Sequence, residues 1–323
     1  MKKQPEPIPV YLICGFLESG KTSMIKNMLT DEYFNGGERT LVILCEEGEE
    51  EYDKETLRIG NAVIETVDEY DQLADHYFAK MDEKYHPERV IIEYNAIWTL
   101  EKLGSIKKPG HWELGQIVSL IDSRTFENYM TNMRTIMADF IRKSDLVIFN
   151  RCDENTTKSP YRRMIKALNA GTDVIFENLD GTSEDGVADE DLPYDVKADP
   201  IEISDKLFGI FYLDAMEHPN RYDGKKLHFK GVAFPVEDAP AGMYVFGRLA
   251  MTCCAADISP IGFLVKAAQK PPVQKWKDLV CTAQAAFSPL HDRDSLVMTE
   301  VTLVDTLPPK DEVVDFNIQT VQQ

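Results

Sequence analysis

The stretch GFLESGKT, residues 15–22, constrains this chain more than any other feature of its sequence. It fits the pattern G-x-x-x-x-G-K-[ST] and directly follows the apolar run Val10–Cys14. We expect that run to be a β-strand and Thr22–Leu29 to be a helix. The stretch therefore has the strand–loop–helix context that a phosphate-binding loop requires.

Each residue type in this pattern has a physical task. Gly15 and Gly20 let the backbone curl so that its N–H groups point at phosphate oxygens. Lys21 can reach the β- and γ-phosphates, and the Thr22 hydroxyl can bind Mg²⁺. The positive end of the following helix favours an anion at the same place. The alternative is a glycine-bearing turn between a strand and a helix that binds nothing.

The first 178 residues alternate short apolar runs with helical patterns, which predicts a mostly parallel sheet covered by helices on both faces. One expected amphipathic helix spans residues 67–83, where apolar residues recur at helical spacing. The fold class is therefore α/β, of the P-loop type. The expected strands are Pro9–Cys14, Thr40–Cys45, Ala62–Thr66, Arg89–Glu93, Ile117–Ile121, Asp145–Phe149 and Asp173–Phe176.

The pattern changes after residue 178. Residues 179–204 are acidic and turn-rich, as expected for a linker or a long surface loop. A short helix over 205–217 then leads into five strand patterns separated by Pro, Gly and Asp, which predict a small antiparallel barrel of the OB type in residues 205–323. Those strands are Lys226–Phe234, Met243–Cys254, Ile261–Lys266, Asp278–Phe287 and Val297–Val304.

Composition narrows the class of partner. The 323 residues include 35 basic and 55 acidic side chains, a net charge of −20. A nucleic-acid-binding protein needs clustered Lys and Arg to neutralise phosphates, so we expect no nucleic-acid partner. The start MKKQPEPIP lacks the apolar stretch of a signal peptide, which favours the cytoplasm. Six cysteines in a reducing compartment indicate buried thiols or metal ligands rather than disulfides.

Five stretches in order resemble the CobW-type P-loop GTPases, which act as metal chaperones and metal-insertion factors. They are IPVYLICGFLESGKTS, RTLVILCEEGEEEYD, RVIIEYNA, SLIDS and KSDLVIFNRCD, within residues 8–178. The last contains Asn150 and Asp153 of the N-K-x-D motif, whose aspartate accepts hydrogen bonds from guanine that adenine cannot donate. Arg151 replaces the lysine and keeps its charge. The resemblance therefore implies GTP and Mg²⁺ as cofactors.

The resemblance also implies site residues. Lys21, Glu93 and Asp122 would be catalytic, with Lys21 stabilising phosphate charge and the two carboxylates supporting metal and water. Glu46 and Glu49 match family positions and, with Thr22, would hold Mg²⁺ or form the switch; the alternative for these glutamates is a solvated charged loop. Nucleotide-binding residues would be Gly15, Glu18, Ser19, Gly20, Lys21, Thr22, Ser23, Asn150, Arg151 and Asp153.

Three departures from the family affect this interpretation. The Cys-x-Cys-Cys metal motif is missing, because residues 54–88 contain no cysteine. Ala96 stands in place of the glycine of the Glu-x-x-Gly motif, where a methyl group could loosen the switch. The second half also does not resemble the usual His-rich partner domain. Glu18 stands where the family has a glycine within the phosphate loop, but its side chain can point outward.

The second half contains GRLAMTCCAADISP, which resembles the Cys-Cys-Ala-Ala-Asp domain of proteins proposed to be permease subunits in metal homeostasis. Adjacent cysteines on a strand point to opposite faces, so both thiolates can reach one soft cation only if the strand ends or bulges there. A transition-metal site, with Zn²⁺ as the cofactor considered, would use Cys253, Cys254 and Asp257. The alternatives are one core cysteine beside an incidental one, and redox chemistry.

The leading hypothesis is a slow GTPase switch coupled to transition-metal trafficking, with zinc as the first candidate. The alternative is a nucleotide-dependent adaptor that scarcely hydrolyses GTP and docks on a metal permease. A small-molecule kinase is less favoured because Asn150 and Asp153 would have no role in it. The partners considered are a metal ion, a client metalloprotein, a membrane permease and a second copy of the chain.

Overall fold

The computed structural model describes residues 7–73, 76–185, 192–235, 242–266, 272–273, 275–288 and 293–316. They divide into two compact units. The first holds the elements from β1 to β6 together with β7 and β8, and the second holds α7 and the elements from β9 onward. Helix α7 (Lys158–Leu168) belongs to the second unit although it precedes β7 and β8 in the sequence, so the units do not divide at one point of the chain. The domain boundary at residue 178 therefore stays a prediction.

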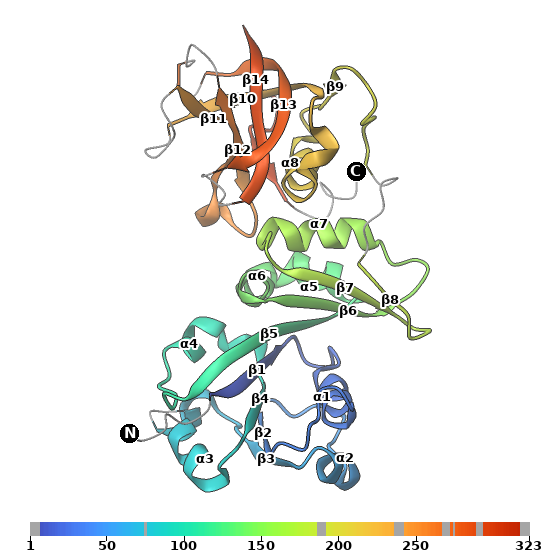
Figure 1. Cartoon of the computed structure of the whole chain (residues 1–323), viewed down its shortest axis with the longest axis vertical. Helices are drawn as coiled ribbons and strands as arrows, with labels where there is room; N and C mark the ends of the chain where they lie inside the picture. Colours follow the sequence, from blue (N-terminus) through green and yellow to red (C-terminus); the bar gives the residue numbers. More distant parts are fainter. Residues whose placement is uncertain are drawn as a thin grey trace. The chain divides into compact units, whose positions relative to one another are not determined.

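The first unit is built on an eight-stranded sheet in the order β3-β2-β4-β1-β5-β6-β7-β8 (Figure 1). Every neighbouring pair is parallel except β7 and β8. This confirms the expected α/β fold of the P-loop type. The strands are β1 (Ile8–Cys14), β2 (Thr40–Leu44), β3 (Ala62–Thr66), β4 (Arg89–Glu93), β5 (Trp112–Asp122), β6 (Leu146–Cys152), β7 (Asp173–Asn178) and β8 (Ser183–Glu184).

Helices cover both faces of this sheet. Figure 1 shows α1 and α2 on one face and α3 and α4 on the other. Ile13, Val42 and Ile91 of the central strands pack with Ile25 and Leu29 of α1 in one fully buried apolar cluster. The helices are α1 (Lys21–Thr30), α2 (Lys54–Ile59), α3 (Tyr77–Tyr85), α4 (Leu100–Gly104), α5 (Phe126–Asn132) and α6 (Arg134–Lys143), with 3₁₀ turns η1 (Tyr70–Leu73) and η2 (Ala96–Trp98).

The helix expected over residues 67–83 is wrong in its extent. Its first part is the 3₁₀ turn η1, and α3 begins only at Tyr77. His76 has φ 83°, which a continuous right-handed helix cannot contain. The Gln72 side chain also accepts a hydrogen bond from the Asp68 N–H and so stabilises a local turn.

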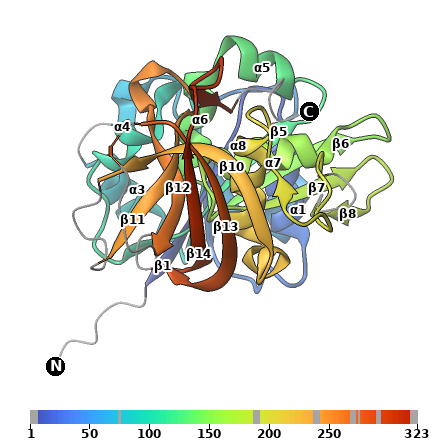
Figure 2. The same cartoon turned by 90° about the horizontal axis from the view of Figure 1, so that it is seen from above.

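The second unit contains the expected five-stranded barrel (Figure 2). Strands follow the order β11-β12-β14-β13-β10, and the pairing of β10 with β11 closes the ring. Only β12 and β14 pair in parallel within the ring, which fits the OB-type barrel expected from the sequence. The strands are β10 (Lys226–Phe234), β11 (Met243–Met251), β12 (Ser259–Lys266), β13 (Lys277–Ser288) and β14 (Arg293–Asp305).

Short elements flank the barrel. Strand β9 (Ile201–Glu202) pairs with β10, and β15 (Val313–Asp315) pairs with β11. Helix α8 (Phe208–Glu217), followed by the 3₁₀ turn η4 (Pro219–Tyr222), contributes buried aromatic rings that pack against rings of β10 and β12. A Cβ atom at Gly247 would lie 2.0 Å from the Ile261 carbonyl oxygen, so glycine is required where β11 and β12 approach closely.

Among the residues described, no helix is long and apolar enough to cross a membrane.

Candidate functional site

The loop between β1 and α1 has the close backbone approach expected of a phosphate cradle. A Cβ atom at Gly15 would lie 2.4 Å from the Leu120 carbonyl oxygen, and one at Gly20 would lie 2.5 Å from Asn150 Nδ2. Both residues also have positive φ, 143° and 98°. Only glycine tolerates such crowding at these dihedral angles, so the two glycines of the motif are sterically required.

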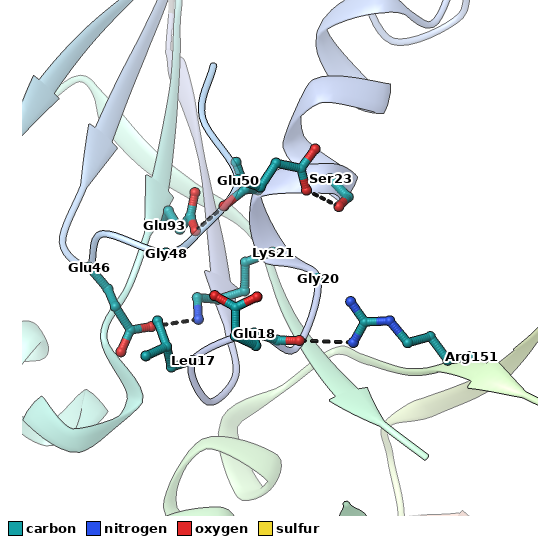
Figure 3. A pocket seen from close by; sticks show the side chains of 11 residues that line it. Leu17, Glu18, Gly20, Lys21, Ser23, Glu46, Gly48, Glu50, Glu93 and Arg151 are labelled. Carbon is teal, nitrogen blue, oxygen red and sulfur yellow. Dashed lines mark hydrogen bonds and ion pairs between the residues drawn. The ribbon is translucent and has the colours of Figure 1, made fainter. Parts of the chain in front are cut away.

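Lys21 begins α1 and is 3% exposed. Its Nζ donates hydrogen bonds to the carbonyl oxygens of Gly15 and Phe16, each at 2.9 Å, and lies 2.7 Å from Glu46 Oε2 (Figure 3). The ammonium group is thereby held over the loop, where a bound phosphate would lie. Glu46 is the counter-ion of Lys21 in this structure.

The next residue, Thr22, joins helix α1 to the end of β4. Its Oγ1 donates to Glu93 Oε1 at 2.9 Å, and the Tyr52 hydroxyl donates to Glu93 Oε2 at 2.6 Å. Glu93 is 2% exposed, and burial raises its pKa although hydrogen bonds from Tyr52 and Thr22 oppose that shift. No sequence motif predicts a role for Tyr52, which stands in the sequence as a phenol near the end of the acidic run EEGEEEYD.

The acidic segment after β2 lines the same pocket. Glu50 accepts hydrogen bonds from Ser23 and Lys26, and both Glu46 and Glu50 line the pocket with Lys21 and Thr22. Glu49 is exposed, and its backbone N–H donates to Glu18 Oε1 at 3.1 Å. The structure thus brings Glu46 into the pocket but leaves the Glu49 side chain at its surface.

Glu18 occupies the loop position where a glycine was expected. Its φ of 61° lies in the left-handed region, which costs a non-glycine residue about 1–2 kcal/mol. The hydrogen bond from Glu49 N–H to the Glu18 carboxylate offsets part of that cost. Figure 3 shows the Glu18 side chain among those that line the pocket with Lys21.

The motif at the end of β6 lies directly against the phosphate loop. Asn150 Nδ2 donates to the Ser19 carbonyl oxygen at 2.6 Å, and Arg151 donates to the Glu18 carbonyl oxygen at 2.8 Å. The β6–β7 register shifts between Phe149 and Cys152, and Arg151 has φ 54°. This bulge turns the two side chains toward the loop.

Asp153 follows that bulge and is exposed. Its Oδ1 accepts hydrogen bonds from the Asn155 N–H and the Thr156 hydroxyl, and these bonds, the former first, hold the pKa of Asp153 below its ordinary value. An ionised, oriented carboxylate is the group that a guanine base requires of this position.

Two buried polar atoms at this site have no hydrogen-bond partner among the residues described, and both fit a nucleotide. They are Ser19 Oγ in the loop and Asn150 Oδ1 beside it. Buried polar groups are nearly always hydrogen-bonded, so the pair indicates that the site is completed by a polar ligand. The donors of the loop, the ammonium of Lys21 and the oxygens of Thr22 and Glu93 match a phosphate and a hard divalent cation.

Comparison with known proteins decides the family. The sequence profile of the CobW/HypB/UreG nucleotide-binding domain matches residues 9–176, more than half of the chain. The chain belongs to the CobW/HypB/UreG family. The profile of the DUF1980 C-terminal domain matches residues 180–308, as the Cys-Cys-Ala-Ala-Asp resemblance implied.

Solved structures are similar only distantly, and no curated protein sequence matches. The Zn(II)-bound YjiA GTPase from E. coli is 17% identical, with 75% of this chain and 86% of that chain covered at a TM-score of 0.37. The hydrogenase maturation factor HypB from Archaeoglobus fulgidus is 15% identical over 54% and 82%, at 0.35. FlhF complexed with GMPPNP and Mg²⁺ is 14% identical over 54% and 67%, at 0.36.

Asp122 of this CobW-family chain lies beside the base-recognition motif. Its carboxylate is 2.7 Å from Arg151 and 2.6 Å from Arg124, and it is absent from the residues that line the Lys21 pocket. Burial alone would raise the pKa of Asp122, but the hydrogen bonds from the two arginines outweigh burial and lower it. The structure therefore pairs Asp122 with Arg151 rather than with Thr22 and Glu93.

The cysteines of this CobW-family chain fall into two groups. Cys14, Cys45, Cys152 and Cys281 are buried, whereas Cys253 is half-buried and Cys254 is exposed. Strand β11 ends at Met251, three residues before the expected end at Cys254. Among the described residues, no group of three or more His, Cys, Asp or Glu side chains is arranged to hold a metal ion.

Proposed function

We propose that this chain is a Mg²⁺-dependent GTPase that switches between nucleotide states and couples them to the trafficking of a transition metal, zinc first. The observation that carries the nucleotide part is the contact of Asn150 and Arg151 with the phosphate loop. One bound nucleotide could therefore meet the phosphate cradle and the base-recognition motif together. The proposal includes a cytoplasmic location, because a GTPase needs a compartment that supplies GTP.

The reaction would be attack of water on the γ-phosphorus, with cleavage of the bond to the β-phosphate and release of GDP and phosphate. Lys21 would bind the phosphate oxygens and stabilise their charge. Thr22 Oγ1 and the Glu93 carboxylate, which lie 2.9 Å apart, would be the oxygen ligands that hold Mg²⁺, and the ion would supply charge neutralisation when bound. Tyr52 would orient Glu93, and Asp122 would hold Arg151 against the loop.

The metal part of the proposal rests on the resemblance to metal chaperones and on the exposed cysteine pair of the second unit. The absence of the Cys-x-Cys-Cys motif from residues 54–88 removes the usual transfer site from the nucleotide domain. A metal would accordingly be held elsewhere, and the nucleotide state would determine when it is bound or released.

Ala96 favours the adaptor as a second candidate. It is 5% exposed and begins the 3₁₀ turn η2 directly after β4, where a methyl group replaces the family's glycine. If the N–H of this turn must approach the γ-phosphate, the protein would bind GTP tightly and hydrolyse it poorly. Such a protein would act by docking on a metal permease or client in its GTP state.

Two measurements test the proposal. Isothermal titration with GTP and ATP in the presence of Mg²⁺ should show binding of GTP alone, and the absence of guanine-nucleotide binding would end the proposal. Phosphate release should then be measured with and without Zn²⁺, Co²⁺ and Ni²⁺. Metal-stimulated turnover supports the GTPase switch, whereas tight binding without turnover supports the adaptor.

A further inference from the structure

The turn between β11 and β12 is organised around one carboxylate. Asp257 Oδ1 accepts the Thr252 N–H at 3.1 Å. Its Oδ2 accepts the Thr252 hydroxyl at 2.6 Å and the Cys253 N–H at 2.7 Å. The Asp257 N–H donates to the Cys254 carbonyl oxygen at 3.0 Å, which closes the turn. Because the carboxylate is occupied by these donors, its task here is to fix the backbone.

The same turn brings two thiols together. On a regular strand Cys253 and Cys254 would point to opposite faces. Since β11 has already ended at Met251, the two Sγ atoms instead lie 3.8 Å apart, one half-buried and one exposed. Both thiolates can reach one cation only if the strand ends or bulges at the pair, and β11 does end before it.

The separation of the two sulfur atoms matches a shared metal ion better than a covalent bond. Two thiolates that each lie about 2.3 Å from one tetrahedral zinc ion are about 3.8 Å apart. A disulfide would need about 2.05 Å, little more than half the observed distance. The observed pair can therefore accept one ion with no change in the separation of its sulfur atoms.

We infer that Cys253 and Cys254 form a two-thiolate site for one thiophilic cation, with Zn²⁺ as the ion tested, and that Asp257 is a positioning residue rather than a ligand. Binding would release one proton from each thiol as its sulfur bonds the metal. Two protein ligands leave coordination positions open, which suits an ion that is received and passed on. The site would identify where the proposed switch holds its metal, yet it can be tested without nucleotide.

The other cysteines make a clean assay feasible. Burial raises the pKa of Cys14, Cys45 and Cys281 to about 12, and Cys152 is fully buried. A thiol reagent applied to the folded, reduced chain should therefore titrate two cysteines. Unfolded chain would expose all six, so the same count reports on folding.

The experiment uses the full chain, reduced, metal-free and without GTP. Zn²⁺ should protect both reactive thiols at one ion per chain, and Co²⁺ should give a thiolate-to-metal charge-transfer band in the near ultraviolet. The double variant Cys253→Ser/Cys254→Ser should lose the band and the reactive thiols while its GTP titration stays unchanged. Unprotected thiols, or a band that survives in the double variant, would overturn the inference.

The role of Asp257 has its own readout. Asp257→Ala should keep two reactive thiols but weaken Zn²⁺ binding about 10-fold to 100-fold, because a group that orients a ligand contributes that much to metal affinity. Asp257→Asn retains an oxygen acceptor and should restore part of the affinity. Asp311→Ala, at an exposed acid of the same unit, is the matched control. If Asp257→Ala binds Zn²⁺ as tightly as the control does, Asp257 has no positioning role.

Discussion

At the proposed phosphate end of the nucleotide site Lys21 and Glu93 are 3% and 2% exposed, whereas at the proposed base end the Arg151 side chain is 34% exposed and Asp153 is exposed. The phosphate end is built from groups that already satisfy one another, Lys21 with Glu46 and Thr22 with Glu93. The base end offers a single oriented carboxylate in a turn. Affinity should therefore come mainly from the first region and nucleotide choice from the second.

The largest effect is expected at the phosphate end. Lys21→Ala removes an ammonium group whose hydrogen bonds to phosphate oxygens contribute about 1.5–3 kcal/mol each, so two lost bonds weaken GTP binding by about 100-fold or more. Titration calorimetry measures the change. Lys26→Ala, five residues further along α1 and paired with Glu50, is the control and should stay within about 3-fold of the original affinity. Equal losses in both variants would show that general charge, not the cradle, binds the phosphates.

A smaller but more selective effect is expected at the base end. Asp153→Asn replaces an acceptor by an amide and should weaken GTP binding about 10-fold to 100-fold, the discrimination that one bidentate contact to a base provides. Xanthosine triphosphate carries a carbonyl where guanine carries an amino group, so its binding should strengthen.

Competition between the two nucleotides measures this exchange. Glu154→Gln alters the next, exposed residue and is the matched control. If Asp153→Asn weakened the binding of both nucleotides equally, Asp153 would have no role in base recognition. The proposed difference between the two ends of the site would then be wrong.

A substitution at Glu46 tests whether its carboxylate competes with a bound phosphate for Lys21. Because GTP must displace the Glu46 carboxylate from the nearly buried Lys21, Glu46→Gln should tighten GTP binding about 10-fold, the value of one charge-assisted hydrogen bond of about 1.5 kcal/mol. Competition with a fluorescent GDP analogue measures the change. Weaker binding would instead support the Mg²⁺ or switch role expected from the sequence.

The smallest effect concerns Asp53, which accepts the Thr56 N–H and caps α2 where the acidic segment ends. The Thr56 N–H and hydroxyl lower the pKa of this exposed carboxylate from 3.8 to about 2. A depressed carboxylate stabilises the fold above its ordinary pKa, and that stabilisation is lost as the pH falls from 3.8 toward 2.

Thermal midpoints of the original chain and Asp53→Ala should therefore differ above this window and converge within it. Asp53→Asn, which keeps an oxygen cap, should remain closer to the original chain. Curves that stay parallel through the window would show that the cap does not depend on ionisation.

The parts of the site that sequence predicts well are those held by local geometry. Gly15, Gly20 and Lys21 lie in one eight-residue loop whose sterics leave few other residue types, and the loop has the expected strand and helix on either side. Asn150 and Arg151 were also expected at the nucleotide, and the structure brings both to the loop through backbone contacts.

Contacts between distant segments were harder to foresee. Tyr52 reaches Glu93 across 41 positions of sequence, and no periodicity marks a phenol in an acidic loop. Asp122 was expected beside Mg²⁺, but two arginines that no motif couples to it lie next to its carboxylate. Strand β11 stops at Met251 because Asp257, six residues later, captures the backbone of the turn. Such partners depend on side-chain reach rather than on spacing.

The Lys21–Glu46 pair also bears on how quickly a nucleotide can leave. Without a second anion nearby, the release of a phosphate would leave the nearly buried Lys21 ammonium group without a counter-ion. The transition state for release would then contain an uncompensated charge. Because the Glu46 carboxylate lies 2.7 Å from this ammonium group, one anion can replace the other during exit. The Lys21 ammonium group would then have a counter-ion throughout release. Product release would be an exchange of counter-ions, and its rate would depend on how freely the segment that carries Glu46 can approach Lys21.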